Sequence, residues 1–211
     1  MIKIFIADDH PVLRRGLKQL IDETPDLTVV GEAADGREVL DKIFKHAIDV
    51  LLLDISLPII SGFEIIKEIK SKNPKFQILV LSMHPEEQYA LRVMRAGASG
   101  YLNKEGDPDE LIAALRKVAR GEKYITSVLA EKLAAELVRN DQKKPLHELL
   151  SDREYQVLLL LGKGRTVGQI AVDLFLSPKT ISTYRSRILE KMGMGSNADV
   201  IRYVIEHNLV D

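Results

Sequence analysis

Five short apolar runs alternate with helix-forming segments over the first 125 residues. The runs lie at residues 2–7, 27–33, 49–54, 76–82 and 99–104. Helix start and stop signals stand between them, among them Ser61 with Glu64 as a capping box and Gly97 as a terminator. Strands that alternate with helices require a parallel sheet covered by helices on both faces. We therefore predict a doubly wound α/β domain with five parallel strands.

Carboxylates stand at the ends of two of these runs. Val50 to Leu53 are apolar throughout, and the run ends abruptly on Asp54, while Asp8 and Asp9 follow the first run. Ligands of open parallel sheets bind beyond the carboxyl ends of the strands, so we expect the three acids to converge there. Their charges would repel one another, and a hard divalent cation such as Mg²⁺ relieves that conflict.

A hydroxyl and a lysine end two further runs. Ser82 closes the fourth run and Lys104 the fifth. With Mg²⁺, these groups can bind one phosphoryl group, and Asp54 is the natural nucleophile because carboxylates form acyl phosphates. Lys104 and Mg²⁺ would neutralise the phosphoryl oxygens, and Ser82 would donate a hydrogen bond to one of them. Each residue alone is more often a cap or a surface residue, but chance is a poor explanation for the whole set.

The strand–helix alternation stops at about residue 122. "SVLAEKLAAELV" can form an isolated helix, whereas "RNDQKKPLHE" is polar and is broken by Pro145. We interpret residues 122–148 as an interdomain linker with partial helix. A chain of 211 residues has room for a domain on each side of such a linker, namely residues 1–121 and residues 149–211.

The C-terminal segment, residues 149–211, shows no strand pattern and divides into four short helices, so we predict a small all-α domain. The helix starts are marked by Ser151 with Glu154, Thr166 with Gln169, Ser177 before Pro178, and Asn197.

The helix that begins at Pro178 has two distinct faces. Ile181, Ile188 and Leu189 form a stripe that faces a core. On another face, small or polar groups able to approach base edges follow helical spacing, at Lys179, Ser182, Thr183 and Ser186. Basic residues that can pair with phosphates flank this face, at Arg185, Arg187 and Lys191.

Charge supports a nucleic-acid partner for this helix. The whole chain carries a net charge of −1, but residues 178–192 hold four basic side chains and one acidic. A short helix, a tight turn and this second helix together predict a helix-turn-helix. The alternative is a surface helix in an ordinary four-helix bundle.

Residues 1–121 resemble the receiver domain of two-component response regulators. The resemblance rests on "ADDHPVLRRGL", "LLLDISLPIISGFEII", "ILVLS" and "AGASGYLNKEGDPDELI". It implies a flavodoxin- or CheY-like fold and phosphorylation of Asp54 by the histidine of a sensor kinase. It also implies direct Mg²⁺ ligation by Asp9 and Asp54, a contribution of Asp8 through water, and ligation by the Ser56 backbone carbonyl. Tyr101 stands at the switch position, where the aromatic ring turns inward after the hydroxyl residue moves toward the phosphoryl group.

Three residues beside this pocket have no clear role in the pattern. His10 and His84 are candidate catalytic bases, but we favour their interpretation as boundary residues of a subfamily. Met83 is bulkier than the small residue that follows the hydroxyl position in many receivers. It bears on how freely small phosphodonors and water reach the pocket.

Residues 149–209 resemble the LuxR-type DNA-binding domain. The matching positions are Leu150, Arg153, Glu154, Gly164, Ile170, Ala171, Ser177, Lys179, Thr180, Ile181 and Lys191. Tyr184 departs from the histidine that many members carry, which bears on a phosphate contact. The last helix dimerises in this family, and Val200, Ile201 and Val204 are the matching candidates, although they also fit an ordinary core. A receiver followed by such a domain is the NarL/FixJ class of response regulator.

We therefore expect a phosphorylation-dependent transcription regulator rather than an enzyme, beyond its own phosphorylation and dephosphorylation. The expected partners are a sensor histidine kinase, double-stranded DNA with paired half-sites, RNA polymerase, and a second copy of the chain after phosphorylation. Zero cysteines, an N-terminus unlike a signal peptide and the lack of a run of ~20 apolar residues predict a cytoplasmic protein without membrane contact.

Two other functions stay open at this stage. An aspartyl-phosphate phosphatase usually has a second carboxylate two residues after the nucleophile, where this chain has Ser56. A receiver that no longer uses phosphate would bind DNA constitutively, but the complete set of five pocket residues argues against it.

Overall fold

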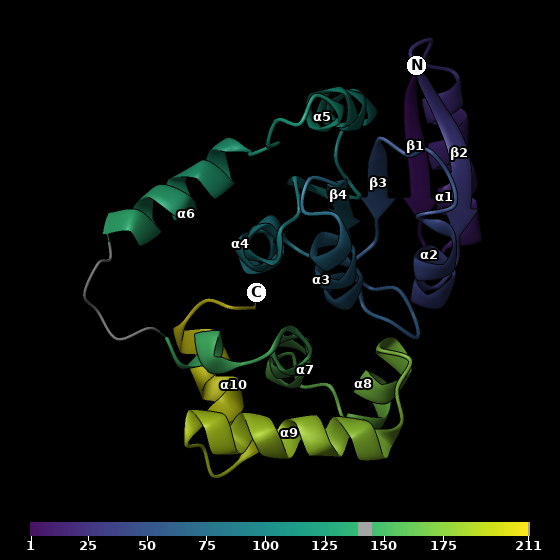
Figure 1. Cartoon of the computed structure of the whole chain (residues 1–211). Coiled ribbons are helices and arrows are strands. Elements are labelled where there is room, and N and C mark those ends of the chain that lie inside the picture. Colours follow the sequence, from purple (N-terminus) through teal and green to yellow (C-terminus); the bar gives the residue numbers. More distant parts are fainter. Residues whose placement is uncertain (139–144, 211) are drawn as a thin grey trace. The chain divides into compact units, whose positions relative to one another are not determined.

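The computed structural model describes residues 1–138 and 145–210, and the chain divides into two compact units, Met1–Val138 and Arg139–Asp211. The first unit alternates strands and helices along the chain (Figure 1). Its elements are β1 (Ile2–Ala7), α1 (Pro11–Asp22), β2 (Leu27–Ala33), α2 (Gly36–Lys42), β3 (Val50–Leu53), α3 (Gly62–Lys72), β4 (Gln77–Ser82), α4 (Glu86–Ala96), β5 (Gly100–Asn103), α5 (Pro108–Ala119) and α6 (Ser127–Val138).

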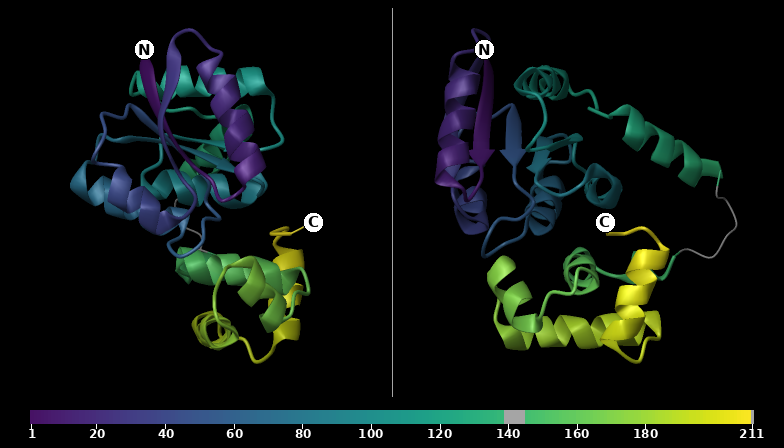
Figure 2. Two further views of the ribbon diagram at one scale, coloured as in Figure 1. Left: turned by 90° about the vertical axis from the view of Figure 1, so that its right-hand side faces the viewer. Right: turned by 180° about the vertical axis from the view of Figure 1, so that it is seen from behind.

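The five strands form one parallel sheet in the order β2-β1-β3-β4-β5, which confirms the predicted fold class. Helices lie on both sides of the sheet (Figure 2). Alternate strand residues point to opposite faces, so Ile4, Ile6 and Leu52 join one core cluster with Leu17 of α1 and Leu115 of α5. The reversal of strand order between β1 and β3 places the ends of these two strands side by side, at the position where such sheets bind ligands.

The predicted helix caps are present in this unit. Ser61 and Glu64 form a capping box at the start of α3, and Asp107 accepts a hydrogen bond from the Asp109 amide at the start of α5. Gly97 ends α4 with φ of +113°, a conformation that favours glycine. These local signals fix where the chain turns back toward the sheet.

The described part of the predicted linker contacts the first unit. Tyr124 forms a parallel bridge with Gly100 of β5, and its amide donates to the Ser99 carbonyl at 2.8 Å. Leu129 of α6 is buried, and α6 packs against α4. Leu129 therefore packs within the first unit, although the segment was expected to link two domains. The polar stretch 139–144 of the predicted linker lies outside the described residues.

The second unit is helical throughout its described residues. Its elements are the 3₁₀ helix η1 (Leu146–Leu149) and the helices α7 (Asp152–Gly162), α8 (Val167–Asp173), α9 (Pro178–Met192) and α10 (Asn197–Glu206). The predicted capping boxes open α7 and α8. Buried residues of α7, α9 and α10 form the core, and a Cβ added at Gly162 would lie 2.5 Å from Val204, so α7 and α10 approach closely. Among the described residues, every helix is too short or too polar to span a bilayer.

Candidate functional site

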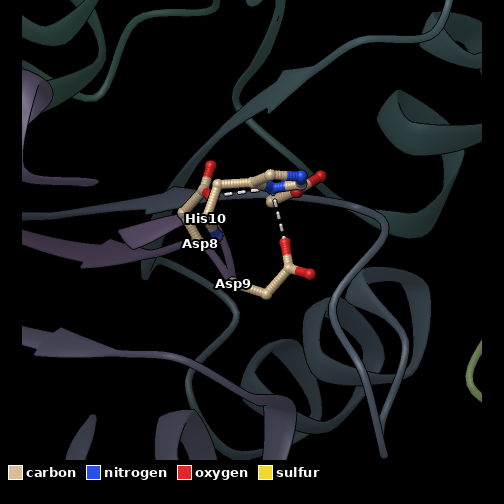
Figure 3. A group of neighbouring side chains, drawn as sticks. Asp8, Asp9 and His10 are labelled. Atoms are coloured by element: carbon tan, nitrogen blue, oxygen red, sulfur yellow. Dashed lines mark hydrogen bonds and ion pairs between the residues drawn. The ribbon is translucent and has the colours of Figure 1, made fainter. Parts of the chain in front are cut away.

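The three predicted carboxylates converge at the carboxyl end of the sheet. The Asp54 amide donates to the Ala7 carbonyl at 2.8 Å, which holds the end of β3 beside the end of β1. Asp8, Asp9, His10 and Asp54 each offer one ligand atom, and these atoms lie within 4.8 Å of one another. Figure 3 shows Asp8, Asp9 and His10 gathered at the end of β1. Strand register thus produces the cluster that the sequence predicted.

Lys104 joins two of these acids from the end of β5. Its Nζ lies 2.6 Å from Asp8 Oδ2 and 2.7 Å from Asp54 Oδ2, and all three side chains are at most 3% exposed. Burial raises the pKa of Asp54, and the charge of Lys104 offsets only part of that effect. Burial also lowers the pKa of Lys104, but Asp54 and Asp8 raise it more, so this lysine stays charged. The pocket therefore contains a fixed cation beside the central carboxylate.

The remaining oxygen atoms suit a hard cation. Asp8 Oδ1 accepts from the His10 amide at 2.8 Å, and Asp54 Oδ1 accepts from the Ser56 amide at 2.9 Å. Asp9 Oδ1 is buried and accepts no hydrogen bond from the described residues, although His10 Nδ1 lies 2.8 Å away. Several carboxylate oxygens around one point, one of them unsatisfied, match the donor set that Mg²⁺ prefers.

The loop between β3 and α3 is shaped tightly around Asp54. A Cβ added at Gly62 would lie 2.6 Å from Ile55 Cα and 3.0 Å from the Asp54 carbonyl, so only glycine fits there. Ile59 has φ of +70° and is 55% exposed, and the Ile60 amide donates to the Pro58 carbonyl. A positive φ strains the backbone of a residue other than glycine, and such strain persists only where the surrounding structure fixes the conformation.

Ser82 and Tyr101 are connected through His84 and not through Asp54. Ser82 is fully buried, and its Oγ accepts from the His84 amide at 3.1 Å. The fully buried Tyr101 donates its hydroxyl to the His84 carbonyl at 2.7 Å. The His84 ring stacks on Tyr89, and its Nε2 lies 3.2 Å from Ser56 Oγ. His84, which we treated as a boundary residue, therefore links the pocket to the switch position.

The sequence carried only a weak signal for this role. His84 lies two residues after Ser82, at a strand end, and its contacts depend on a loop conformation that periodicity does not predict. His10 lies inside the acidic group even though its side chain is 65% exposed. Met83 is 57% exposed beside the pocket.

The second candidate site is the exposed face of α9. Ser177 caps this helix through the Thr180 amide at 3.1 Å, and α8 packs against α9 across a turn in which Phe175 has φ of +54°. A hollow on this helix is lined by Lys179, Thr180, Thr183, Tyr184 and Arg187. Ser182 and Ser186 are also exposed on α9, as the spacing predicted.

Two of the predicted phosphate-contacting residues have partners within the unit. Lys191 Nζ donates to Glu154 Oε2 at 2.7 Å, and Arg185 Nε donates to Asn197 Oδ1 at 2.5 Å. Both contacts attach α9 to a neighbouring helix, α7 or α10. This favours a structural contribution for Lys191 and Arg185, whereas Lys179 and Arg187 remain exposed at the hollow.

The predicted dimer residues are corrected in part. Val200 and Val204 are fully buried in the core of the second unit, and Ile201 is half-buried. A side chain without exposed surface cannot contact a second chain while the unit stays folded. Val200 and Val204 therefore fit the alternative that they belong to the core. Ile205 of α10, which is 59% exposed, presents more apolar surface than either of them.

Comparisons with known proteins agree with this arrangement. Residues 4–116 match the response regulator receiver domain, and residues 148–204 match the luxR family of bacterial regulatory proteins. The chain is 34% identical to the response regulator UvrY of Escherichia coli K12 over 99% of this chain and 96% of that protein. It is 36% identical to the oxygen regulatory protein NreC of Staphylococcus carnosus over the full length of both.

A solved structure is similar over nearly the whole chain. It is RcsB from Salmonella enterica serovar Typhimurium bound to promoter rprA in the presence of phosphomimetic BeF₃⁻. The TM-score is 0.64 at 29% identity, with 97% of this chain and 98% of that one covered. The matches to both units and to full-length relatives settle the family. The chain is a two-component response regulator of the NarL/FixJ class, with a receiver domain followed by a LuxR-type DNA-binding domain.

Proposed function

We propose that Asp54 is the phosphoryl acceptor through which a sensor histidine kinase controls DNA binding by α9. The observation that carries this proposal is the buried contact of Asp54 with Lys104 beside Asp8 and Asp9. In the reaction, an Asp54 carboxylate oxygen bonds to phosphorus as the phosphorus–nitrogen bond to the kinase histidine breaks. The product is an acyl phosphate on Asp54.

Lys104 and Ser82 act on the transferred group. Lys104 Nζ, now on Asp54 Oδ2, is positioned to move onto a phosphoryl oxygen as the new bond forms. The Ser82 hydroxyl donates to another phosphoryl oxygen once it turns from the His84 amide. Asp8, Asp9, Asp54 and the Ser56 carbonyl would hold Mg²⁺, which supplies positive charge next to the phosphoryl group when bound.

The switch then runs through His84. A shift of Ser82 toward the phosphoryl group alters the hydrogen bond that the His84 amide donates, and Tyr101 is bonded to the carbonyl of the same residue. The surface formed by α4 and β5 changes in consequence, and with it the tendency of the protein to form a homodimer. Phosphorylation and hydrolysis of its own Asp54 are the only reactions we expect the protein to perform.

The proposed target is double-stranded DNA with paired half-sites, bound in the major groove by α9. The proposed DNA contacts are Lys179, Thr180, Ser182, Thr183, Tyr184, Ser186 and Arg187. The predicted phosphate contacts Arg185 and Lys191 instead hold α9 in place through Asn197 and Glu154. The bound promoter and the phosphomimetic named for the RcsB structure support this pairing of switch and output. Contact with RNA polymerase and action in the cytoplasm follow from the role of a transcription regulator.

The decisive experiment compares the parent chain with Asp54→Ala and the near-isosteric Asp54→Asn. Each protein is incubated with Mg²⁺ and a small phosphodonor, and intact mass, DNA affinity and oligomeric state are measured. We expect a phosphoryl adduct and tighter DNA binding for the parent only. Equal DNA affinity and dimerisation in all three proteins would mean that Asp54 is not the switch. Turnover of an external phosphoester well above background would instead favour the phosphatase.

A further inference from the structure

Two exposed hydroxyls on α9 already use their only proton within the helix. Thr183 Oγ1 lies 3.1 Å from the Lys179 carbonyl oxygen, and Ser186 Oγ lies 3.1 Å from the Ser182 carbonyl oxygen. A carbonyl oxygen only accepts, so each hydroxyl is the donor in its bond. Neither hydroxyl has another hydrogen-bond partner in the part of the chain that the structure describes.

This arrangement fixes what the two side chains present to a ligand. A hydroxyl has one proton and two lone pairs, so once its proton is donated backward it can only accept from outside. Thr183 adds its γ-methyl group, which is apolar. Both residues are exposed on the face of α9 that carries Lys179 and Ser182. The centre of this face therefore offers hydrogen-bond acceptors and a methyl group.

The major groove contains complementary groups on only some base edges. The 6-amino group of adenine and the 4-amino group of cytosine donate there, and thymine presents its 5-methyl group. Guanine presents only acceptors, O6 and N7, which would face the lone pairs of Thr183 and Ser186 without a proton between them. Acceptors of that kind require a donor such as the ammonium of Lys179 or the guanidinium of Arg187.

We propose that Thr183 and Ser186 select operator bases by accepting hydrogen bonds from adenine or cytosine amino groups, with the Thr183 methyl against a thymine methyl. Guanine is disfavoured at the positions under Thr183 and Ser186, and its acceptors need a donor such as Lys179 or Arg187. This inference rests on the proposed binding of DNA by α9 and adds the chemical class of base edge that each side chain recognises.

The test begins with selection of binding sites by the full chain. A randomised duplex library is selected with and without beryllofluoride and Mg²⁺, and the tighter-binding state is used afterwards. Thr183→Ala and Ser186→Ala are selected in parallel, and the base pairs whose preference changes mark the positions under each side chain. If no sequence is selected by the parent, the proposed function itself fails and the inference falls with it.

Base analogues at the marked positions then reveal the direction of each hydrogen bond. Purine in place of adenine removes the 6-amino group, uracil in place of thymine removes the methyl group, and 7-deazapurines remove N7. We expect loss of an amino group to weaken parent binding by about fivefold, the size of one neutral hydrogen bond, and loss of N7 at these positions to change nothing. At base positions contacted by Lys179 or Arg187, removal of N7 should weaken binding and removal of an amino group should not.

Two matched substitutions separate the hydroxyl of Thr183 from its methyl group. Thr183→Val keeps the methyl and removes the acceptor, so its binding should no longer respond to loss of the amino group. Thr183→Ser keeps the hydroxyl and should no longer respond to uracil in place of thymine. Circular dichroism verifies that both variants keep their helix content. The inference is overturned if removal of N7 weakens binding of the parent but not of Thr183→Val or Ser186→Ala. That result would show that the hydroxyls donate hydrogen bonds to the bases. A site preference that neither alanine variant changes would overturn it as well.

Discussion

Lys191 of α9 donates to the buried carboxylate of Glu154 at 2.7 Å, although 37 residues separate the two in sequence. Glu154 also closes the capping box of α7 by accepting from the Ser151 amide at 2.8 Å. One carboxylate thus joins the start of α7 to the end of α9. The sequence alone indicated two separate roles, a helix cap and a phosphate contact.

We predict that Lys191→Met destabilises the DNA-binding unit by about 1 kcal/mol, since it leaves a buried carboxylate without its cation. The estimate is modest because Lys191 is itself 42% exposed. Chemical denaturation followed by circular dichroism measures the change. Well below the unfolding transition, DNA affinity should stay near that of the parent.

Arg187→Met is the matched control for this prediction, because Arg187 is exposed at the hollow on α9. It should weaken DNA binding and reduce its salt dependence without loss of stability. The reverse pattern, in which Lys191→Met is fully stable but binds DNA poorly, would restore Lys191 to the DNA interface.

The same ion pair predicts a dependence of stability on pH. Burial raises the pKa of Glu154, but hydrogen bonds from Lys191 and Ser151 lower it more, so the net pKa lies below the usual value. A lowered pKa in the folded state means that the stabilisation is complete above the unfolded value of about 4.3 and is lost as pH falls through the folded value. Unfolding free energies of the parent and Glu154→Gln, measured across this range, should approach each other toward acid pH. A constant difference would show that Glu154 contributes no charge-dependent stability.

Residues whose positions follow from strand order were predicted correctly from the sequence. Asp8, Asp54 and Lys104 converge because parallel strands end at one edge of the sheet, and apolar runs reveal where each strand ends. The caps at Ser61 and Ser151 were also predictable, because both partners of a capping box lie within one turn. Local pattern and strand topology therefore suffice for most of the fold and for the acids of the pocket.

Contacts that depend on tertiary packing were not predictable. The roles of His84 and Lys191 depend on side-chain conformations and on partners far away in the sequence. Val200 and Val204 fit both a dimer surface and a core, and only burial separates the two. The helix at 127–138 is apolar on several sides, so its sequence did not indicate which neighbour it contacts.

Tyr101→Phe should lower the DNA affinity of the unphosphorylated protein. The Tyr101 hydroxyl bonds to the His84 carbonyl, which favours the inward position of the ring. Loss of one buried hydrogen bond costs about 1 kcal/mol, so the ratio of inward to outward ring positions falls by about fivefold. The measurement compares DNA affinity with and without beryllofluoride, and the affinity with beryllofluoride should change less.

Tyr124→Phe is the control for the switch, because the Tyr124 hydroxyl donates to Glu110 at 2.6 Å and does not contact His84. Its DNA binding should match the parent in both conditions. Equal behaviour of Tyr101→Phe and the parent would show that the hydrogen bond to His84 does not bias the switch.

Helix α6 follows the receiver sheet and packs against α4. Leu129 is 1% exposed where α6 packs on α4, and the Thr126 hydroxyl at the start of α6 bonds to Glu86 at the start of α4. If this packing is part of the folded receiver, Leu129→Ala should destabilise residues 1–138 by about 2–4 kcal/mol, as for other buried leucines. Val128→Ala, at a position that is 41% exposed, should cost much less. Equal unfolding midpoints for the two variants would mean that α6 does not stabilise the receiver, and that residues after Tyr124 behave as a linker.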